Sequence, residues 1–170
     1  MSAFNIDISQ ENAKRRLRSA PRTSGRRPRS DRGTSRIDPR VLSWLAEAMA
    51  GYDRPPIAEV LTRLTERCRN EGLAPPSRAT VYGLLGTLPT ATYRVAELPP
   101  AVRSALYNLD QGSDVPGHQL AFYCFNYGDL AAVSFAAGLP WLALHQARRL
   151  PGYRAKSRGL LEAVARVRDI

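Results

Sequence analysis

Few side chains in this sequence could carry out covalent chemistry. The chain holds two cysteines and two histidines, of which only His118 and Cys124, six residues apart, could form a thiolate–imidazole pair. The aromatic segment around Cys124 would raise the pKa of its thiol rather than lower it, and no third residue is placed to orient the imidazole. P-loop, G-x-S-x-G and H-E-x-x-H motifs are absent from the sequence, as are paired carboxylates at a useful spacing. We therefore predict a protein that is not an enzyme and that has no metal and no cofactor.

The charge of the chain indicates an anionic partner instead. The 170 residues include 25 Lys and Arg against 15 Asp and Glu, a formal net charge of +10. Such an excess is typical of proteins that bind nucleic acid, which we rank ahead of a membrane surface. The apolar runs are shorter than a membrane span requires, and the first residues lack the apolar core of a secretion signal. The sequence therefore predicts a cytoplasmic, nucleoid-associated protein that binds double-stranded DNA and no membrane.

Much of the positive charge lies near the N-terminus. Residues 11–40 hold eleven Lys and Arg against three acids, a net charge of +8. Residues 1–36 are rich in Ser, Gly, Pro and Thr, and cannot bury enough apolar surface to offset the entropy of ordering. We predict a disordered basic arm there, with Arg26, Arg27 and Arg29 contacting DNA phosphates or the minor groove. The alternative is a solubilising leader, or a misplaced start codon, with no binding role.

Three helices are predicted after the arm. Asp38 can cap the first, over 38–50, and the second, over 57–71, has apolar residues at helical spacing and a glycine as its stop. The third, over 77–85, begins at Ser77, a favourable N-cap that follows two prolines. Its apolar side chains face inward, which leaves four positions facing outward: Arg78, Ala79, Tyr82 and Gly83.

The end of the second helix and the third helix resemble the helix-turn-helix domain of phage Mu-type and related transposases and integrases. The residues that carry the likeness are Gly72, Leu73, Pro76, Ser77, Thr80, Val81 and Tyr82. The resemblance covers residues 38–85 and implies major-groove binding by the third helix, but no transposase catalysis. It implies four DNA contacts: Ser77, Arg78, Thr80 and Tyr82. Transposases usually carry Arg after the tyrosine, where this chain has Gly83, so the alternative is a plain helical packing unit without groove contacts.

The second half of the chain is predicted to form a small helical domain over 98–170, after the helix-turn-helix domain over 37–88. Between them, residues 86–98 indicate a turn and a short extended piece, either a wing hairpin or a linker. Residues 118–127 are strand-like in composition, but they lie between helices, and we predict a helix there. The aromatic side chains are expected to form the core of this half: Phe122, Tyr123, Phe125, Tyr127, Phe135 and Trp141.

A second helix-turn-helix is a further candidate, over 129–150. Ser134, Gly138 and Leu144 have the spacing of the small residue, the turn glycine and the apolar residue of that motif. Outward and flanking side chains would then contact bases or phosphates: His145, Gln146, Arg148, Arg149, Arg154, Lys156 and Arg158. The alternative is an ordinary helical hairpin with solvated charges. In either case, Ser157 can cap the last helix.

These observations predict a mainly α protein: a three-helix helix-turn-helix unit, a small C-terminal helical unit and a basic N-terminal arm. The predicted function is DNA binding by a small bacterial-type transcriptional regulator, extended by hypothesis to the autoregulating antitoxin of a toxin operon. The partners would be duplex DNA and either a second copy of the chain or an operon-encoded protein. Two alternatives are a protein-interaction or neutralising module, and a non-catalytic accessory protein of a mobile element.

Overall fold

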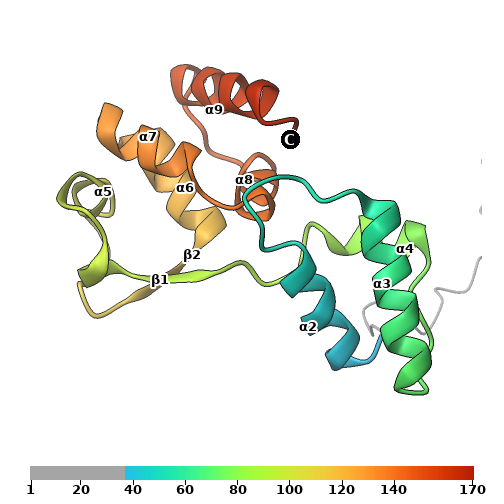
Figure 1. Ribbon diagram of the computed structural model, residues 1–170. Coiled ribbons are helices and arrows are strands. Elements are labelled where there is room, and N and C mark those ends of the chain that lie inside the picture. Colours follow the sequence, from blue (N-terminus) through green and yellow to red (C-terminus); the bar gives the residue numbers. More distant parts are fainter. Residues whose placement is uncertain (1–36) are drawn as a thin grey trace, which may run out of the picture. The chain divides into compact units, whose positions relative to one another are not determined.

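The computed structural model describes residues 37–170, so the predicted arm over 1–36, with Arg26, Arg27 and Arg29, lies outside the described residues. The described part is mainly helical, as predicted (Figure 1). Two short strands and a 3-10 turn accompany the helices. In chain order the elements are α2 (Pro39–Ala48), α3 (Ile57–Asn70), α4 (Arg78–Leu84), β1 (Thr92–Arg94), η1 (Val95–Glu97), α5 (Pro100–Ala105), β2 (Asp114–Pro116), α6 (Gly117–Tyr127), α7 (Leu130–Ala137), α8 (Trp141–Ala147) and α9 (Ala155–Val167).

Each of the first three of these helices has a capping residue or a stop glycine at one of its ends. The Asp38 carboxylate accepts a backbone hydrogen bond at the start of α2. The chain leaves α3 through Gly72, whose φ of 68° lies in the left-handed region that favours glycine. The Ser77 hydroxyl accepts the backbone N–H of Thr80 at 3.1 Å and so caps α4. The three predicted helices are therefore confirmed. Because the cap at Ser77 fixes where α4 begins, it also fixes which positions of the helix face outward.

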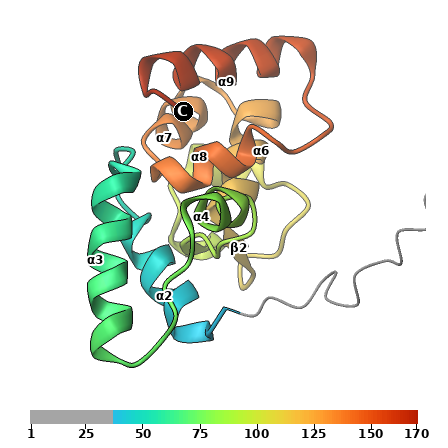
Figure 2. The same ribbon diagram turned by 90° about the vertical axis from the view of Figure 1, so that its right-hand side faces the viewer.

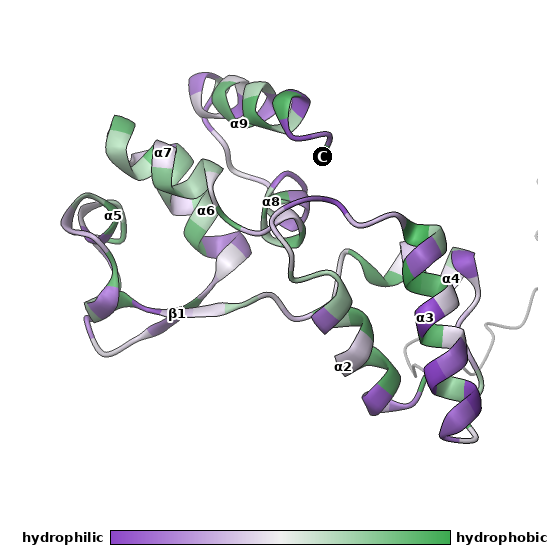
Figure 3. Ribbon diagram, in the orientation of Figure 1, coloured by the Kyte–Doolittle hydropathy of each residue, from purple (hydrophilic) through white to green (hydrophobic). Residues whose placement is uncertain are grey.

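A first apolar core joins these helices to α8. α3 is amphipathic, with hydrophilic residues along one side (Figure 3). Its apolar face packs on α2, and both meet residues from α8 that the sequence interpretation assigned to the other half. The buried residues of this core are Val41, Leu45, Met49, Ile57, Val60, Leu64, Cys68, Val81, Leu85, Leu88, Trp141 and Leu142. The assignment of Trp141 to the C-terminal core is thus wrong, because α8 inserts that ring among α2–α4.

A second core surrounds α6. This segment is helical, as predicted for residues 118–127, and it packs against α5, α7, α8 and α9. Phe125 is buried in this core, whereas Phe122, Tyr123 and Phe135 are only half-buried and Tyr127 is exposed. The expectation that all these aromatic rings form the core is therefore wrong for Tyr127, which lies at the surface.

The extended piece after residue 88 forms neither a wing hairpin nor a free linker. β1 pairs antiparallel with β2, with Tyr93 opposite Val115. The two strands are separated in sequence by η1 and α5, so the ribbon encloses a helix instead of a tight turn. Val115 is buried and anchors β2 in the second core.

Residues 36–170 form one compact unit that contains both cores. α8 contributes to each of them, with Trp141 and Leu142 in the first and Ala143, Leu144 and Ala147 in the second. α9 runs across the top of α7, α8 and α6 (Figure 2), and it packs against α6. Among the described residues, no single helix is long and apolar enough to cross a membrane; α7 and α8 reach that composition only as a pair, bent by 118°.

Candidate nucleic-acid interface

The exposed face of α4 presents an arginine and a tyrosine side by side. Arg78 and Tyr82 are four residues apart and both exposed, and the Arg78 guanidinium lies 5.7 Å from the centre of the Tyr82 ring. The guanidinium of Arg78 lowers the pKa of the Tyr82 hydroxyl, and the guanidinium of Arg54 contributes a smaller lowering. Gly83, next along the helix, has open space where a side chain would begin. α4 therefore offers a cationic, aromatic edge that a large ligand can approach closely.

Two further predicted contacts on α4 are occupied by the cap. The hydroxyls of Ser77 and Thr80 lie 2.8 Å apart and hydrogen-bond each other, while Ser77 also accepts the Thr80 backbone N–H. Ser77 is exposed and Thr80 is half-buried. These two residues position α4, and the side chains that α4 leaves free for a ligand are Arg78 and Tyr82.

Arginines from two other segments extend this surface. Arg54, in the loop before α3, lies close enough to Tyr82 to lower its pKa and stands 5.8 Å from the Trp141 ring. Arg149 follows α8, and its guanidinium lies beside Gly86, which comes directly after α4. A Cβ atom added to Gly86 would lie only 2.9 Å from Nη1 of Arg149. We call Arg54, Arg78, Tyr82 and Arg149 the α4 cluster.

The α4 cluster meets little negative charge within the described residues. Arg54 lies 3.8 Å from Asp169, whose side chain is 95% exposed, and that contact is worth little in water. Arg78 and Arg149 form no ion pair with any described residue. The positive charge of the cluster is therefore available to an external anion.

Sequence reasoning missed Arg54, because it lies between the two predicted helices over 38–50 and 57–71, where no pattern marks a binding residue. Its position depends on a tertiary contact: the Trp141 backbone N–H donates to the Gly51 carbonyl at 3.1 Å and so ties this loop to α8. No local pattern in the sequence signals that contact. A basic residue beside a proline pair was the only available hint.

His145 lies behind the cluster rather than on its surface. Its ring stacks on Trp141, with centroids 4.6 Å apart, and its buried Nε2 has no hydrogen-bond partner among the described residues. Burial, reinforced by Arg149, Arg54 and Arg148, lowers the pKa of His145 to about 4. The predicted outward orientation of His145 is therefore wrong, and the imidazole is neutral near pH 7.

Gln146 is buried, so its predicted role in reading bases is not compatible with the structure. Only 7% of the residue is exposed, and its Nε2 donates to the carbonyls of Leu85 and Leu88, at 3.0 and 2.8 Å. Both carbonyls belong to the turn that follows α4. Gln146 therefore holds the C-terminal end of α4 against α8 instead of facing solvent.

The second helix-turn-helix is contradicted by the same burial. α8, its supposed recognition helix, is covered along nearly all of its length. Ser134, the small residue expected at the helix crossing, is exposed, whereas Ala132 and Ala136 are buried instead. α7 and α8 thus form an ordinary helical hairpin, of which α8 is covered by the two cores and α7 is partly exposed.

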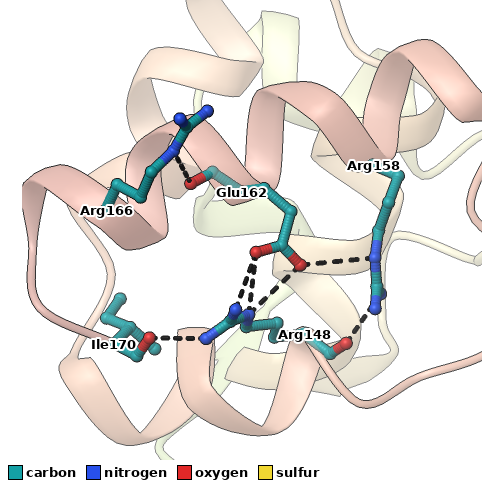
Figure 4. Close-up of polar contacts among 5 residues, drawn as sticks. All are labelled: Arg148, Arg158, Glu162, Arg166 and Ile170. Atoms are coloured by element: carbon teal, nitrogen blue, oxygen red, sulfur yellow. Dashed lines mark hydrogen bonds and ion pairs between the residues drawn. The ribbon is translucent and has the colours of Figure 1, made fainter.

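Arg148 and Arg158 are engaged within the chain. Arg148 makes two hydrogen bonds to the Glu162 carboxylate through Nε, at 3.1 and 3.0 Å, and its Nη1 donates to the Ile170 carbonyl (Figure 4). Arg158 lies 3.4 Å from the same carboxylate and donates to the Arg148 carbonyl at 2.7 Å. These contacts tie α9 and the last residue to the end of α8, so both arginines are better described as structural.

Arg154 and Lys156, at the start of α9, are exposed. The Arg154 guanidinium lies 4.9 Å above the Tyr127 ring, and it forms no ion pair with a carboxylate of residues 37–170. The helix begins at Ala155, before Ser157, which is buried and does not serve as the cap. The predicted cap at Ser157 is therefore wrong.

The predicted site residues that the structure describes thus fall into four groups, of which Ser77 and Thr80 form the cap of α4. Arg78, Tyr82 and Arg149 lie together in the α4 cluster, whereas Arg154 and Lys156 remain exposed beside an aromatic surface. His145, Gln146, Arg148 and Arg158 are packed or paired within the fold.

In comparisons with known proteins, no family model matches the chain, and no curated protein or solved structure matches it.

Proposed function

We propose that the chain is a transcriptional regulator that binds duplex DNA, with α4 as its recognition helix. The observation that carries this proposal is the α4 cluster. Arg78 and Tyr82 project from one exposed helix face, and Arg54 and Arg149 flank them, with a single exposed ion pair between Arg54 and Asp169. An arginine on a helix in the major groove can pair bidentately with guanine, while flanking arginines contact phosphates.

The geometry of the surface supports this division of roles. Arg54 approaches Tyr82 and Arg149 lies beside Gly86, just past the C-terminal end of α4, so both flank the helix from outside it, where the DNA backbone would pass if α4 lay in the groove. The connection between α3 and α4 spans residues 71–77, longer than in the compact helix-turn-helix, in which the turn has about three or four residues. The comparison with a helix-turn-helix therefore concerns the order of the helices and the exposed third helix, not the turn.

The experiment is a fluorescence-anisotropy titration of a duplex of random sequence, repeated over a range of salt concentrations. Arg54→Ala and Arg149→Ala should each weaken binding on all duplexes and flatten the slope of log affinity against log salt by about 1. Arg63→Ala is the matched control, because Arg63 is an exposed arginine on α3 that pairs with Glu59. Unchanged affinity and slope in both cluster variants would overturn the proposal.

Sequence preference tests the recognition role of α4 separately. Selection from a random duplex pool should enrich a short motif with the wild-type chain, and Arg78→Ala should relax preference at one position by about 1–3 kcal/mol. An equal loss of affinity on every sequence would assign Arg78 to a phosphate instead. If no motif is enriched, the regulator assignment fails even where general DNA binding holds.

A further inference from the structure

A row of five aromatic rings runs across the surface of the second core. It joins the segment after α5, the helix α6 and the loop before α9, and consists of Tyr107, Tyr127, Tyr123, Phe122 and Tyr153. Successive ring centroids along the row lie 5.5, 6.0, 5.8 and 4.8 Å apart. We call these residues the tyrosine row.

The exposed end of the row is unusually open for aromatic side chains. Tyr107 is 70% exposed and Tyr127 is 39% exposed. Their rings meet edge to face at an angle of 82°, so each stabilises the orientation of the other. A tyrosine with 70% of its surface in water gains little from burial beyond its contact with Tyr127. The ring of Tyr107 is therefore better placed to contact a ligand than to stabilise the fold.

Two guanidiniums lie over rings of the same row. Arg154 is 4.9 Å above Tyr127, and Arg158 is 5.6 Å from the centre of Tyr153. Lys156, between them in sequence, is exposed. Cations stacked on aromatic faces suit a ligand that combines negative charge with flat rings.

The acidic groups near the row are already engaged or lie at its margin. The Asp129 carboxylate accepts the Ala132 backbone N–H and caps α7. Glu162 is held by Arg148 and Arg158, and Asp110 is exposed beyond the end of α5. Asp129 keeps its negative charge while it caps α7, so an anion would bind at the Arg154 guanidinium, which lies directly over the Tyr127 ring.

We propose that the tyrosine row binds single-stranded nucleic acid, with bases stacking on Tyr107 and Tyr127 and phosphates contacting Arg154 and Lys156. Stacking on tyrosine tolerates any base, so the site would bind a strand without reading its sequence. A second copy of the chain fits less well, because a symmetric contact over this face would bring the same cations, Arg154 and Lys156, toward each other. The site is separate from the α4 cluster and does not depend on duplex binding there.

The experiment uses the full chain and a fluorescein-labelled oligothymidylate of about twenty nucleotides. Tyr107→Ala and Tyr127→Ala should each weaken binding on the order of tenfold, the equivalent of losing one stacked base. Tyr107→Phe should retain the affinity, because the phenyl face remains. Tyr52→Ala is the matched control, since Tyr52 is also exposed and lies beneath a guanidinium, that of Arg168, outside the tyrosine row.

An abasic oligonucleotide of the same length separates stacking from simple charge attraction. It should bind the wild type more weakly than oligothymidylate does, and the tyrosine substitutions should not weaken it further. Equal binding of both strands, or unchanged oligothymidylate affinity in Tyr107→Ala and Tyr127→Ala, would overturn the proposal. Arg154→Ala provides a second variant that leaves the aromatic packing in place, and it should weaken both strands.

Two more readouts distinguish a single-strand site from a general DNA surface and from a contact between copies of the chain. Duplex affinity should be unchanged in Tyr107→Ala, whereas Arg78→Ala should weaken duplex and spare oligothymidylate. If Tyr107→Ala weakens duplex and single strand equally, the row is part of one general DNA surface and the single-strand assignment is wrong. If the same variant changes only the sedimentation of the free chain, the row is a contact between copies, which also overturns it.

Discussion

Gln146 links two elements through a single buried amide. Its Nε2 donates to the carbonyls of both Leu85 and Leu88, which end the α4 segment. Gln146→Leu would keep much of the volume but leave both carbonyls buried without a donor. We expect the free energy of unfolding to fall by about 1–3 kcal/mol, measured by urea denaturation. Gln119→Leu, at an exposed position on α6, is the control, and an equal loss there would remove the special role of Gln146.

His145 should make stability depend on pH. Its pKa is about 4 in the folded chain because the ring is buried beside Trp141 and near three arginines. In the unfolded chain an ordinary histidine takes up its proton near pH 6.5. The unfolded state therefore binds more protons between these values, and the free energy of unfolding falls as pH drops from about 6.5 to about 4.

His145→Phe tests this dependence, because a phenyl ring can retain the stack on Trp141 but cannot titrate. Urea denaturation across that pH window should show a shallower decline for the variant than for the wild type. His118 is the comparison residue, since burial also lowers its pKa while Thr90 hydrogen-bonds its Nδ1. If His145→Phe declines as steeply as the wild type, His145 is not the source of the pH dependence.

Residue-level prediction succeeded where a helix has one polar face and failed where it has none. The exposed positions of Arg78 and Tyr82 followed from the cap at Ser77 and the apolar phase of α4. α8 has no such phase, because it is covered by both cores. Gln146 was assigned to solvent from the spacing of the candidate helix-turn-helix and from its polar side chain, and its partners, Leu85 and Leu88, lie about sixty residues away in sequence. Nothing local to α8 could indicate them.

At the scale of elements, one carboxylate on α9 is the centre of its polar contacts with the end of α8. Glu162 accepts hydrogen bonds from Arg148, and that contact, with the nearby charges of Arg158 and Arg166, lowers the pKa of the carboxyl group (Figure 4). Glu162→Gln should weaken the docking of α9 and lower stability by about 1 kcal/mol. Backbone amides of α9 should then exchange with solvent faster than in the wild type.

Glu66→Gln is the matched control for α9, because Glu66 is an exposed glutamate on α3. The pH dependence has a definite sign. A carboxyl whose pKa is lowered by folding adds stability above its unfolded pKa, near 4.3, and loses it as pH falls further. Acidification below that value should therefore lower the protection factors of the α9 amides in the wild type, that is, their protection relative to the intrinsic exchange rate at the same pH, and have less effect on the Glu162→Gln variant. Identical exchange in that variant and the wild type would assign the docking to apolar contacts alone.

Helices could be predicted at this scale, and the strand pairing could not. α3 repeats apolar residues over four turns, which is a strong periodic signal. β1 and β2 have three residues each, too few to show alternation, and they pair across η1 and α5. Their pairing depends on Val115 entering the second core, a long-range event that a local pattern does not record.

At the scale of the whole molecule, the two cores depend on one shared helix. A sequence boundary near residues 88–98 would leave α2–α4 as an independent domain, but their core includes Trp141 and Leu142 from α8. Leu142→Ala should therefore destabilise the first core although it lies in the second half of the chain. The expected loss is about 2–5 kcal/mol for a buried leucine. Urea unfolding should follow one transition by both tryptophan fluorescence and circular dichroism.

A fragment that ends at residue 98 gives the sharpest test of this dependence. It lacks the apolar side chains of Trp141 and Leu142, the Gln146 amide at the end of α4 and the Trp141 backbone bond to Gly51. We expect no cooperative unfolding transition and weakened duplex binding, because both α4 and Arg54 lose their supports and Arg149 is gone. Addition of a fragment that begins at residue 99 should restore both properties if α8 is the missing component. A cooperative transition and full duplex affinity in the first fragment alone would show instead that α2–α4 form a self-sufficient DNA-binding domain.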